Sequence, residues 1–358
     1  MNLKLLFTAG SLLLACACAA PTASTIASDD SFGISAELAN KFAVRDKDAV
    51  APTAAVNAAP APEASASVAS EVPAKGKKGK KGKGKAVKAA KGPAKADAKG
   101  EAPKPASTTK PFENRWTMAP NFQQGEKYRF DITYFGATAG SLELELLEPK
   151  VVNERPSFHL RAIARSVSPF TLFYRLNDTV ESFMDSEGLF SHKFTVKMDE
   201  SLQKRDILEL YDQKAHKVYY WSKLDHKKKG KKDDQLEIDT APYSQDGLSA
   251  FYYLRTLPLE IGKSYEFPIV NNGKLRTVRV TAVRKEELKT KLGTFDTIVL
   301  KPEIALDGAI KTYGDSFVWV SDDPRRLLLK VDAKIKVGSI IAYLREHKDG
   351  QGRATAGR

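Results

Sequence analysis

After Phe112, apolar and polar side chains alternate along the chain with a period of two. Tyr128, Phe130 and Ile132 share one side of such a stretch, and a longer one runs from Leu327 to Val337. Successive side chains of a strand point to opposite faces, so this pattern predicts antiparallel strands with one packed face and one face in water. Leu142, Leu144 and Leu146 alternate as strictly, and looser runs predict further strands at 157–167, 178–185, 190–198, 205–211, 216–222, 264–270, 275–284, 294–302, 315–321 and 339–346.

Helical spacing is confined to short stretches. The clearest is DGLSAFYYLRTLP, in which Asp246 can cap the helix N-terminus and Pro258 ends the helix. SFGISAELANKFAV, from 31 to 44, predicts a shorter helix, and SPFTLFYRL, from 168, suits either a helix or a strand. Many strands with few helices predict a mainly β fold: one large antiparallel curved sheet, as a barrel or a sandwich, covered by one or two helices.

Before this β-rich region the chain is rich in Ala, Pro, Ser, Gly and Lys and poor in large apolar side chains. Such a sequence buries too little surface to offset the entropy of ordering, so we expect disorder. The predicted organisation is a signal peptide at 1–15, a disordered spacer at 16–112, a β-rich domain at 113–349 and a disordered tail at 350–358. A flexible coil of the spacer's length spans roughly 50 Å, which would hold the domain away from a membrane.

The first twenty residues have the layout of an export signal: one charge at Lys4, an apolar stretch from 5 to 15, and small residues after it. The apolar stretch is too short for a membrane-spanning helix. LLAC at 13–16 resembles a bacterial lipobox, which predicts that Cys16 becomes the lipid-modified first residue of the mature chain. Because Ala17, and not aspartate, follows it, the destination would be the outer membrane. The alternative is ordinary cleavage after one of the alanines that follow, and both routes predict a protein that leaves the cytoplasm.

Positive charge is concentrated in one tract. The chain carries +13, and residues 75–104, with 12 lysines against two acidic residues, account for +10. Basic tracts bind phosphates, but this one has no aromatic residues to stack on bases and follows an export signal, so we do not expect nucleic acid as a partner. It is either a spacer that its own charges extend or a contact for anionic lipid head groups and envelope polymers, through Lys75, Lys77, Lys78, Lys80, Lys81, Lys83 and Lys85.

A second basic run, HKKKGKKDD at 226–234, lies between two predicted strands. It is either a solvated hairpin tip, which Asp233 and Asp234 partly neutralise, or a basic loop that contacts a membrane surface or lipopolysaccharide phosphates. In the second case the contacts come from Lys227, Lys228, Lys229, Lys231 and Lys232.

No combination of residues predicts a catalytic or metal site. The histidines are scattered, GKS at 262–264 lacks the glycine that a phosphate loop needs five positions earlier, and Asp322 and Asp323 precede a proline as in a turn. We therefore expect no catalytic residues, no metal and no cofactor. Trp221, Tyr252 and Trp319 could line a pocket for an acyl chain or a sugar, with core packing as the alternative.

Several segments occur in an order that resembles a known family. Between about 123 and 346 the chain contains, in succession, GEKYRFDITYFGATAGSLELEL, VESFMDSEGLFSHKF, QDGLSAFYYLRTLPLEIGK, LGTFDTIVLKP, VWVSDDPRRLLLKV and VGSIIAYL. Their order and spacing resemble the bacterial envelope family known as domain of unknown function 3108. The resemblance implies an exported, mostly β protein of bacteria with outer membranes, and it implies no activity or catalytic residue. A weaker likeness, by analogy alone, is to periplasmic lipoprotein carriers, whose curved sheet shelters acyl chains.

Together these features predict a non-enzymatic periplasmic lipoprotein, tethered to the outer membrane, whose β-rich domain binds a component of the bacterial envelope. The component would be outer-membrane lipid, lipopolysaccharide or peptidoglycan. One alternative is a carrier that holds a lipid or lipoprotein in an apolar cavity of the curved sheet. Another is a hydrolase of envelope glycans, which would need two carboxyl groups at the separation found in glycosidases.

Overall fold

The computed structural model describes residues 29–47, 119–306, 309–310, 315–335 and 337–357, and most of them belong to one antiparallel sheet. Half of the sheet follows chain order. Its strands are β2 (Lys127–Tyr134), β3 (Ala137–Leu146), β5 (Arg155–Ser166), β6 (Leu176–Asp185), β7 (Ser191–Glu200), β8 (Gln203–Asp212), β9 (Lys217–His226) and β10 (Gly230–Asp239).

The other half continues from the opposite side of β2. In spatial order its strands are β17 (Ser339–Lys348), β16 (Leu328–Lys334), β15 (Phe317–Ser321), β13 (Gly293–Leu306), β12 (Lys274–Thr290) and β11 (Ser264–Asn271). Short strands pair locally: β4 (Lys150–Val152) with β5, β1 (Arg45–Asp46) with β4, and β14 (Ala309–Ile310) with β13.

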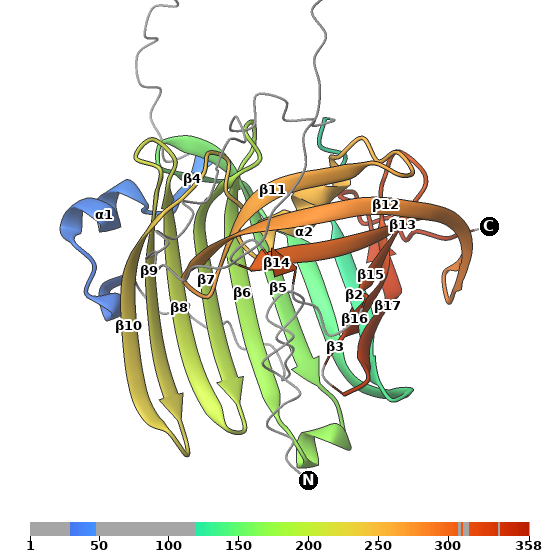
Figure 1. Cartoon of the computed structure of the whole chain (residues 1–358), viewed down its shortest axis with the longest axis horizontal. Coiled ribbons are helices and arrows are strands. Elements are labelled where there is room, and N and C mark those ends of the chain that lie inside the picture. Colours follow the sequence, from blue (N-terminus) through green and yellow to red (C-terminus); the bar gives the residue numbers. More distant parts are fainter. Residues whose placement is uncertain (1–28, 48–118, 307–308, 311–314, 336, 358) are drawn as a thin grey trace, which may run out of the picture. The chain divides into compact units, whose positions relative to one another are not determined.

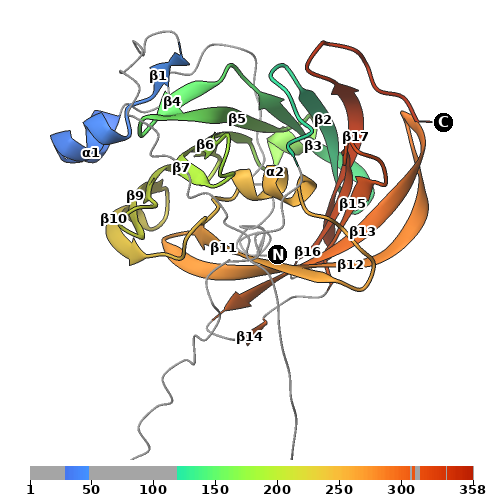
Figure 2. The ribbon, with the colours of Figure 1, turned by 90° about the horizontal axis from the view of Figure 1, so that it is seen from above.

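The sheet curves around a hollow, and α2 (Ser249–Arg255) lies inside it (Figures 1 and 2). Figure 2 shows β11 and β12 across the hollow from β6 and β7, with the helix between them. The predicted mainly β fold with a large curved antiparallel sheet is therefore confirmed. The predicted helix at 246–257 is confirmed as well, and it lies in the hollow because its apolar side chains are buried or half-buried there.

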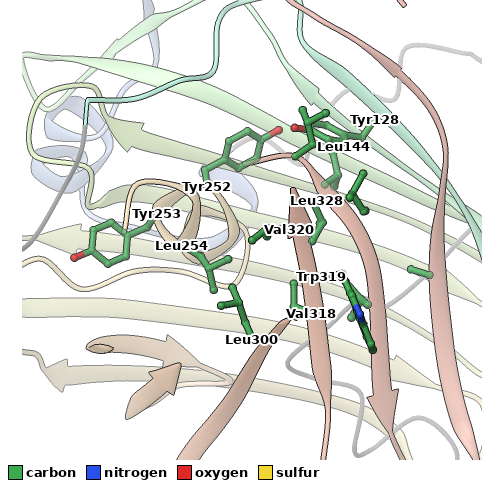
Figure 3. Packing of buried hydrophobic residues seen from close by; sticks show 14 of the residues in the cluster. Tyr128, Leu144, Tyr252, Tyr253, Leu254, Leu300, Val318, Trp319, Val320 and Leu328 are labelled. Atoms are coloured by element: carbon green, nitrogen blue, oxygen red, sulfur yellow. The ribbon is translucent and has the colours of Figure 1, made fainter. Parts of the chain in front are cut away.

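The core forms where alternating apolar side chains face α2. On β2, Tyr128, Phe130 and Ile132 are buried while the residues between them are exposed or half-buried. Figure 3 shows Tyr252 of α2 pointing toward Tyr128 and Leu254 pointing toward Leu300 of β13. Burial of the apolar inner face of the sheet together with the apolar side chains of α2 supplies the main favourable free energy of the fold.

The segment 29–47 corrects the predicted spacer, which was drawn from 16 to 112. It contains the 3₁₀ helix η2 (Asp29–Phe32) and the helix α1 (Ala36–Lys41), which the sequence did predict. Phe42 is fully buried and Phe32 nearly so, on the outer face of the sheet. These two rings supply the apolar surface that the surrounding Ala- and Pro-rich sequence lacks, so this stretch is ordered against the domain.

The tail corrects a second boundary, because residues 350–357 were predicted to be disordered. Lys348 pairs with Ala354 in a β-bridge, and the Gly357 N–H donates to the Leu292 carbonyl at 2.6 Å. His347 Nδ1 lies 2.7 Å from the Thr355 hydroxyl. The composition of the tail suggests disorder, but these long-range polar contacts hold it.

The structure also decides between alternatives for two local segments. The segment after Ser168 forms a short 3₁₀ helix, η4 (Phe170–Leu172), in the connection between β5 and β6. The basic run at 226–234 is only partly a hairpin tip: the turn comprises 227–229, and the remaining lysines lie on β10. β10 was not predicted, because nearly all its side chains are exposed and no alternation marks it.

Candidate binding site

A cavity of about 180 Å³ lies between α2 and the inner face of the sheet. Apolar side chains from both halves of the sheet and from α2 form most of its wall, and Arg205, Glu209, Asn271 and Asn272 are its polar lining. The apolar wall includes Phe130, Leu142, Leu144, Ala162, Ala164, Val180, Phe194, Val196, Met198, Ile207, Leu248, Phe251, Val270, Leu328, Val331 and Ala342.

Asp246 fixes the beginning of α2 beside this cavity. Its carboxylate accepts hydrogen bonds from the hydroxyls of Ser182 at 2.6 Å and Ser191 at 2.5 Å. It also accepts the backbone N–H groups of Leu248 at 2.7 Å and Ser249 at 2.8 Å. Burial raises the pKa of Asp246, and these four donors act in the opposite direction by favouring the carboxylate. The sheet thus holds the first turn of the helix, as the sequence predicted for a capping aspartate.

A buried ion pair fixes the other end of α2. Arg255 donates to both carboxylate oxygens of Glu126, at 2.8 and 2.9 Å, and both side chains are almost fully buried. The Tyr128 hydroxyl and His347 Nε2 also approach this carboxylate, at 3.1 and 3.3 Å. The guanidinium lies over the rings of Tyr128 and Tyr252, at 5.5 and 5.7 Å. Two anchors therefore hold the helix as one wall of the cavity.

Arg205 is the cation at the polar end of the cavity. Its guanidinium donates to three neutral oxygens, those of Tyr220 at 2.7 Å, Ser222 at 2.8 Å and Asn272 at 3.2 Å. No carboxylate forms a salt bridge with it within the described part of the chain. Asn272 is exposed and Arg205 half-buried, so the cavity reaches the surface at this end. The arrangement places an unneutralised positive charge at the opening of an apolar site.

Glu209 contributes the deepest ionisable group of the wall. It lies on the same face of β8 as Arg205, is 2 % exposed, and accepts a hydrogen bond of 2.6 Å from the Tyr211 hydroxyl. Burial raises the pKa of Glu209 to about 8. Burial therefore favours the uncharged form of Glu209, and Arg205 is the cation of the cavity wall.

Residues 129–345 match the family described as protein of unknown function, DUF3108. The chain belongs to the DUF3108 family. Every residue that lines the cavity, from Phe130 to Ala342, lies within the DUF3108 region. Segment 29–47, Glu126 and the tail lie outside it, so the second anchor of α2 uses a partner beyond the family match.

Solved structures include similar proteins. One is a β-barrel-like protein of domain of unknown function DUF1849 from Brucella abortus, with 11 % identity, a TM-score of 0.41, and coverage of 64 % of this chain and 98 % of that chain. Another is a candidate exported protein with a YmcC-like fold from Bacteroides fragilis, with 10 % identity, a TM-score of 0.29, and coverage of 64 % and 97 %. A third is a candidate lipoprotein from Parabacteroides distasonis, with 12 % identity, a TM-score of 0.30, and coverage of 64 % and 99 %. None of the curated proteins compared with the chain matches it.

The structure does not bring the three predicted pocket residues of this DUF3108 protein together. Trp221 is buried on the outer face of β9, where it belongs to the cluster of Phe32 and Phe42. Tyr252 is buried toward Tyr128, and Trp319 packs on β15 beneath the Lys330 ammonium, 4.1 Å from the ring centroid. None of the three lines the cavity. The neighbouring residue Phe251 is the aromatic group that α2 contributes.

The predicted basic contacts fall in two regions. Lys227, Lys228 and Lys229 form the exposed β9–β10 turn, and Lys231 and Lys232 follow on β10. Lys232 pairs with Asp234 at 2.5 Å. The lipidation residue Cys16 and the tract of Lys75, Lys77, Lys78, Lys80, Lys81, Lys83 and Lys85 lie outside the described residues.

The acidic pair predicted to form a turn does so. Asp322 pairs with Arg326 at 3.1 Å and with Lys285 at 2.6 Å, while Asp323 pairs with Arg325 at 2.7 Å. Over the described ranges, no three His, Cys, Asp or Glu side chains gather closely enough to hold a metal ion. No helix in that part of the chain has the length and apolar character needed to cross a bilayer.

Sequence reasoning missed Arg205, Glu209 and Gly247 as cavity residues. On β8, one face carries Arg205, Ile207 and Glu209, while the other carries Leu208 and Leu210. By hydropathy the second face is the better candidate for the inside. It is instead the outer face, because segment 29–47 covers it.

Proposed function

We propose that this protein is a non-enzymatic component of the bacterial envelope that binds the apolar chain of an anionic amphiphile in the cavity beside α2. Cys16 carries the lipid that attaches it to the outer membrane from the periplasmic side. The observation that supports the binding function is the apolar cavity with the unneutralised guanidinium of Arg205 at its opening. An amphiphile with an acyl chain and a carboxylate or phosphate matches both parts of this site.

The volume of the cavity limits what it encloses. An apolar cavity of about 150 Å³ is large enough for a benzene molecule, whereas pockets for drug-sized ligands occupy about 300–1,000 Å³. The 180 Å³ found here suits a short acyl chain whose head group stays at the opening. This favours binding of a short-chain amphiphile over the alternative function of a carrier that shelters a whole lipid.

The chemistry of Arg205 supports an anionic head group. A guanidinium binds carboxylate and phosphate oxygens through paired hydrogen bonds that are stronger than those between neutral groups. Its three present partners are neutral, so exchange of one of them for an anion adds a charge-assisted contact. The buried carboxyl groups nearby suit a hydrolase poorly, because Asp246 is engaged by four donors and holds the helix.

Filling the cavity tests the proposal. A Cβ atom added at Gly247 meets only Phe194, at 3.9 Å, so larger side chains there enter the cavity without a backbone clash. Affinity for a fluorescent fatty acid is expected to fall through the series Gly247→Ala, Gly247→Val and Gly247→Leu. Each excluded methylene costs about 0.8 kcal/mol, so the last variant loses roughly 100-fold. Ala250→Leu on the same helix, outside the cavity wall, is the matched control and keeps its affinity.

The head group is tested with a pair of ligands. Arg205→Gln is expected to weaken binding of a fatty acid by about 10-fold or more while leaving the alcohol of equal chain length unchanged. Equal loss for both ligands would assign Arg205 a structural role only. If neither ligand binds the wild-type protein, and native mass spectrometry of protein from envelopes shows no bound amphiphile, the proposed function is wrong. Loss of membrane attachment in Cys16→Ser tests the lipid anchor separately.

A further inference from the structure

The loops at one end of the strands form a continuous edge, here called the loop rim. It comprises residues 135–136, 167–175, 201–202, 227–229, 335 and 337–338, at the lower end of the molecule in Figure 1. Hydrogen bonds join these loops to one another or to the ends of adjacent strands: Tyr134 to Val337 at 3.2 Å, Val167 to Ala139 at 3.0 Å, Ser201 to Arg175 at 2.8 Å and Lys227 to Leu202 at 2.9 Å. The rim is therefore one connected surface built from loops distant in sequence.

Large apolar side chains project from the loop rim into solvent. Leu172 is 82 % exposed, Phe173 74 %, Phe135 73 % and Val337 52 %. These are the four most exposed large hydrophobic residues in the described part of the chain, and all four lie on this edge. A group of exposed apolar side chains on one edge is typical of an interaction surface, whereas single exposed hydrophobic residues are ordinary.

Positive charge accompanies these apolar tips. Lys227, Lys228, Lys229 and Lys231 are exposed at the β9–β10 turn, and no salt bridge engages them among the described residues. Nearby acidic groups are partly neutralised: Asp199 pairs with Arg175 at 2.9 Å and Asp234 with Lys232. Asp225 and Asp233 stay exposed farther from the tip. The turn itself is cationic.

We propose that the loop rim docks on the surface of a bilayer containing anionic phospholipids. Leu172, Phe173 and Phe135 enter the boundary between head groups and acyl chains, and the lysines of the β9–β10 turn contact the lipid phosphates. The proposal is independent of any ligand in the cavity, because it rests on different residues.

The shape and chemistry of the rim favour a bilayer as its partner. The apolar side chains stand on separate convex tips, one in the β2–β3 turn and others at η4, so they enter a soft interface without requiring a complementary groove. Lysines near an anionic membrane surface contribute about fivefold each to binding, and inserted apolar side chains contribute the remainder. Charge and hydrophobicity on one edge thus match the two layers of the membrane interface.

The decisive experiment places a reporter at the tip. The mature chain carrying Cys16→Ser and Phe173→Trp is mixed with vesicles of phosphatidylethanolamine and phosphatidylglycerol whose acyl chains are brominated. We expect emission from position 173 to be quenched and blue-shifted. Ile261→Trp, which replaces another exposed apolar residue in the loop between α2 and β11, is the matched control and is not quenched. Binding without quenching at 173 would mean that the basic spacer alone attaches the protein, and would overturn the proposal.

Two sets of variants measure how much the apolar side chains and the lysines of the rim each contribute to vesicle binding. In the Phe173→Trp background, the double variant Leu172→Ser and Phe135→Ser is expected to weaken vesicle binding about 100-fold at every salt concentration. Changing Lys227, Lys228, Lys229 and Lys231 to Gln is expected to weaken vesicle binding at low salt. The effect should be far larger than that of changing four exposed lysines on other elements to Gln, namely Lys214, Lys274, Lys289 and Lys348. Equal effects of the two lysine sets, or equal binding to phosphatidylcholine vesicles, would refute the docking surface.

Discussion

Replacing Phe42 by Ala is expected to release segment 29–47 from the sheet while the sheet stays folded. Phe42 is fully buried and packs with Phe32, Val152 and Trp221 on the outer face. Truncation of a buried Phe to Ala costs about 3–5 kcal/mol. That exceeds the contribution of the segment's ion pairs, because partly exposed pairs such as Lys41 with Asp212 are worth about 0–1 kcal/mol each. The apolar contact therefore dominates the attachment.

Trp221 provides the readout, since it is covered by the segment and is 5 % exposed. In a Trp116→Phe background, Phe42→Ala should red-shift the emission and increase acrylamide quenching of Trp221. The main unfolding transition, followed by far-ultraviolet circular dichroism, should keep its cooperativity. Lys41→Ala is the matched control, and a change of at most about 1 kcal/mol is expected for it.

Two outcomes would contradict this reasoning. Unchanged quenching of Trp221 in Phe42→Ala would mean that the segment is held by something other than the buried rings. Complete unfolding of the variant would mean that the segment belongs to the cooperative core. A chain that begins at residue 48 distinguishes the second case, because it removes the segment without leaving a cavity.

Other expectations follow from individual residues. Burial alone would raise the pKa of Glu126, but hydrogen bonds from His347 and Arg255 lower this pKa. The stability that Glu126 contributes is therefore present above pH about 4.5 and is lost on acidification. Glu126→Gln should lower the free energy of unfolding at pH 7 by about 3–5 kcal/mol and flatten its fall below pH 4.5, as urea titrations would show. Burial raises the pKa of Asp178 to about 8, so its ionisation opposes folding increasingly as pH rises from 3.8 to 8. Asp178→Asn should therefore raise the free energy of unfolding by roughly 2–4 kcal/mol at pH 7 and leave it unchanged at pH 3. Equal effects at both pH values would exclude this cause. A Cβ at Gly140 would stand 2.6 Å from a backbone oxygen on β5, so Gly140→Ala should destabilise the sheet by about 1–3 kcal/mol in thermal unfolding.

The strands were predictable wherever one face is packed and the other is in water. β2 and β5 alternate in sequence as they do in burial, which is why their positions agree with the structure. β10 was not predicted, because both its faces are exposed at the edge of the sheet and its sequence therefore does not alternate. β12 runs to Thr290, beyond its predicted end at 284, because its second half carries charged side chains and pairs with β13 all the same.

The binding site was less predictable because it depends on which face becomes the inside. Tyr220 and Trp221 are adjacent aromatic residues on β9, and local pattern does not say which faces the hollow. The inner one is Tyr220, which binds Arg205, while Trp221 is covered by Phe32 and Phe42 from far away in sequence. The same holds on α2, where Phe251 reaches the cavity and Tyr252 does not. Which of the two adjacent aromatic side chains faces the inside is set by the tertiary contacts of segment 29–47 and of Glu126.

The packing of segment 29–47 changes what the lysine-rich region connects. Residue 47 and residue 119 both belong to the folded unit, so the lysine-rich region leaves from and returns to the same domain. Twelve residues separate Cys16 from the first described residue, Asp29, and the thirteen residue steps between them reach at most about 45 Å. A lipid on Cys16 would therefore confine the domain to a thin layer next to the membrane, at a high local concentration of head groups. In that layer even a weak affinity of a surface for lipid suffices to orient the protein, and inserting residues between 48 and 118 would leave this confinement unchanged.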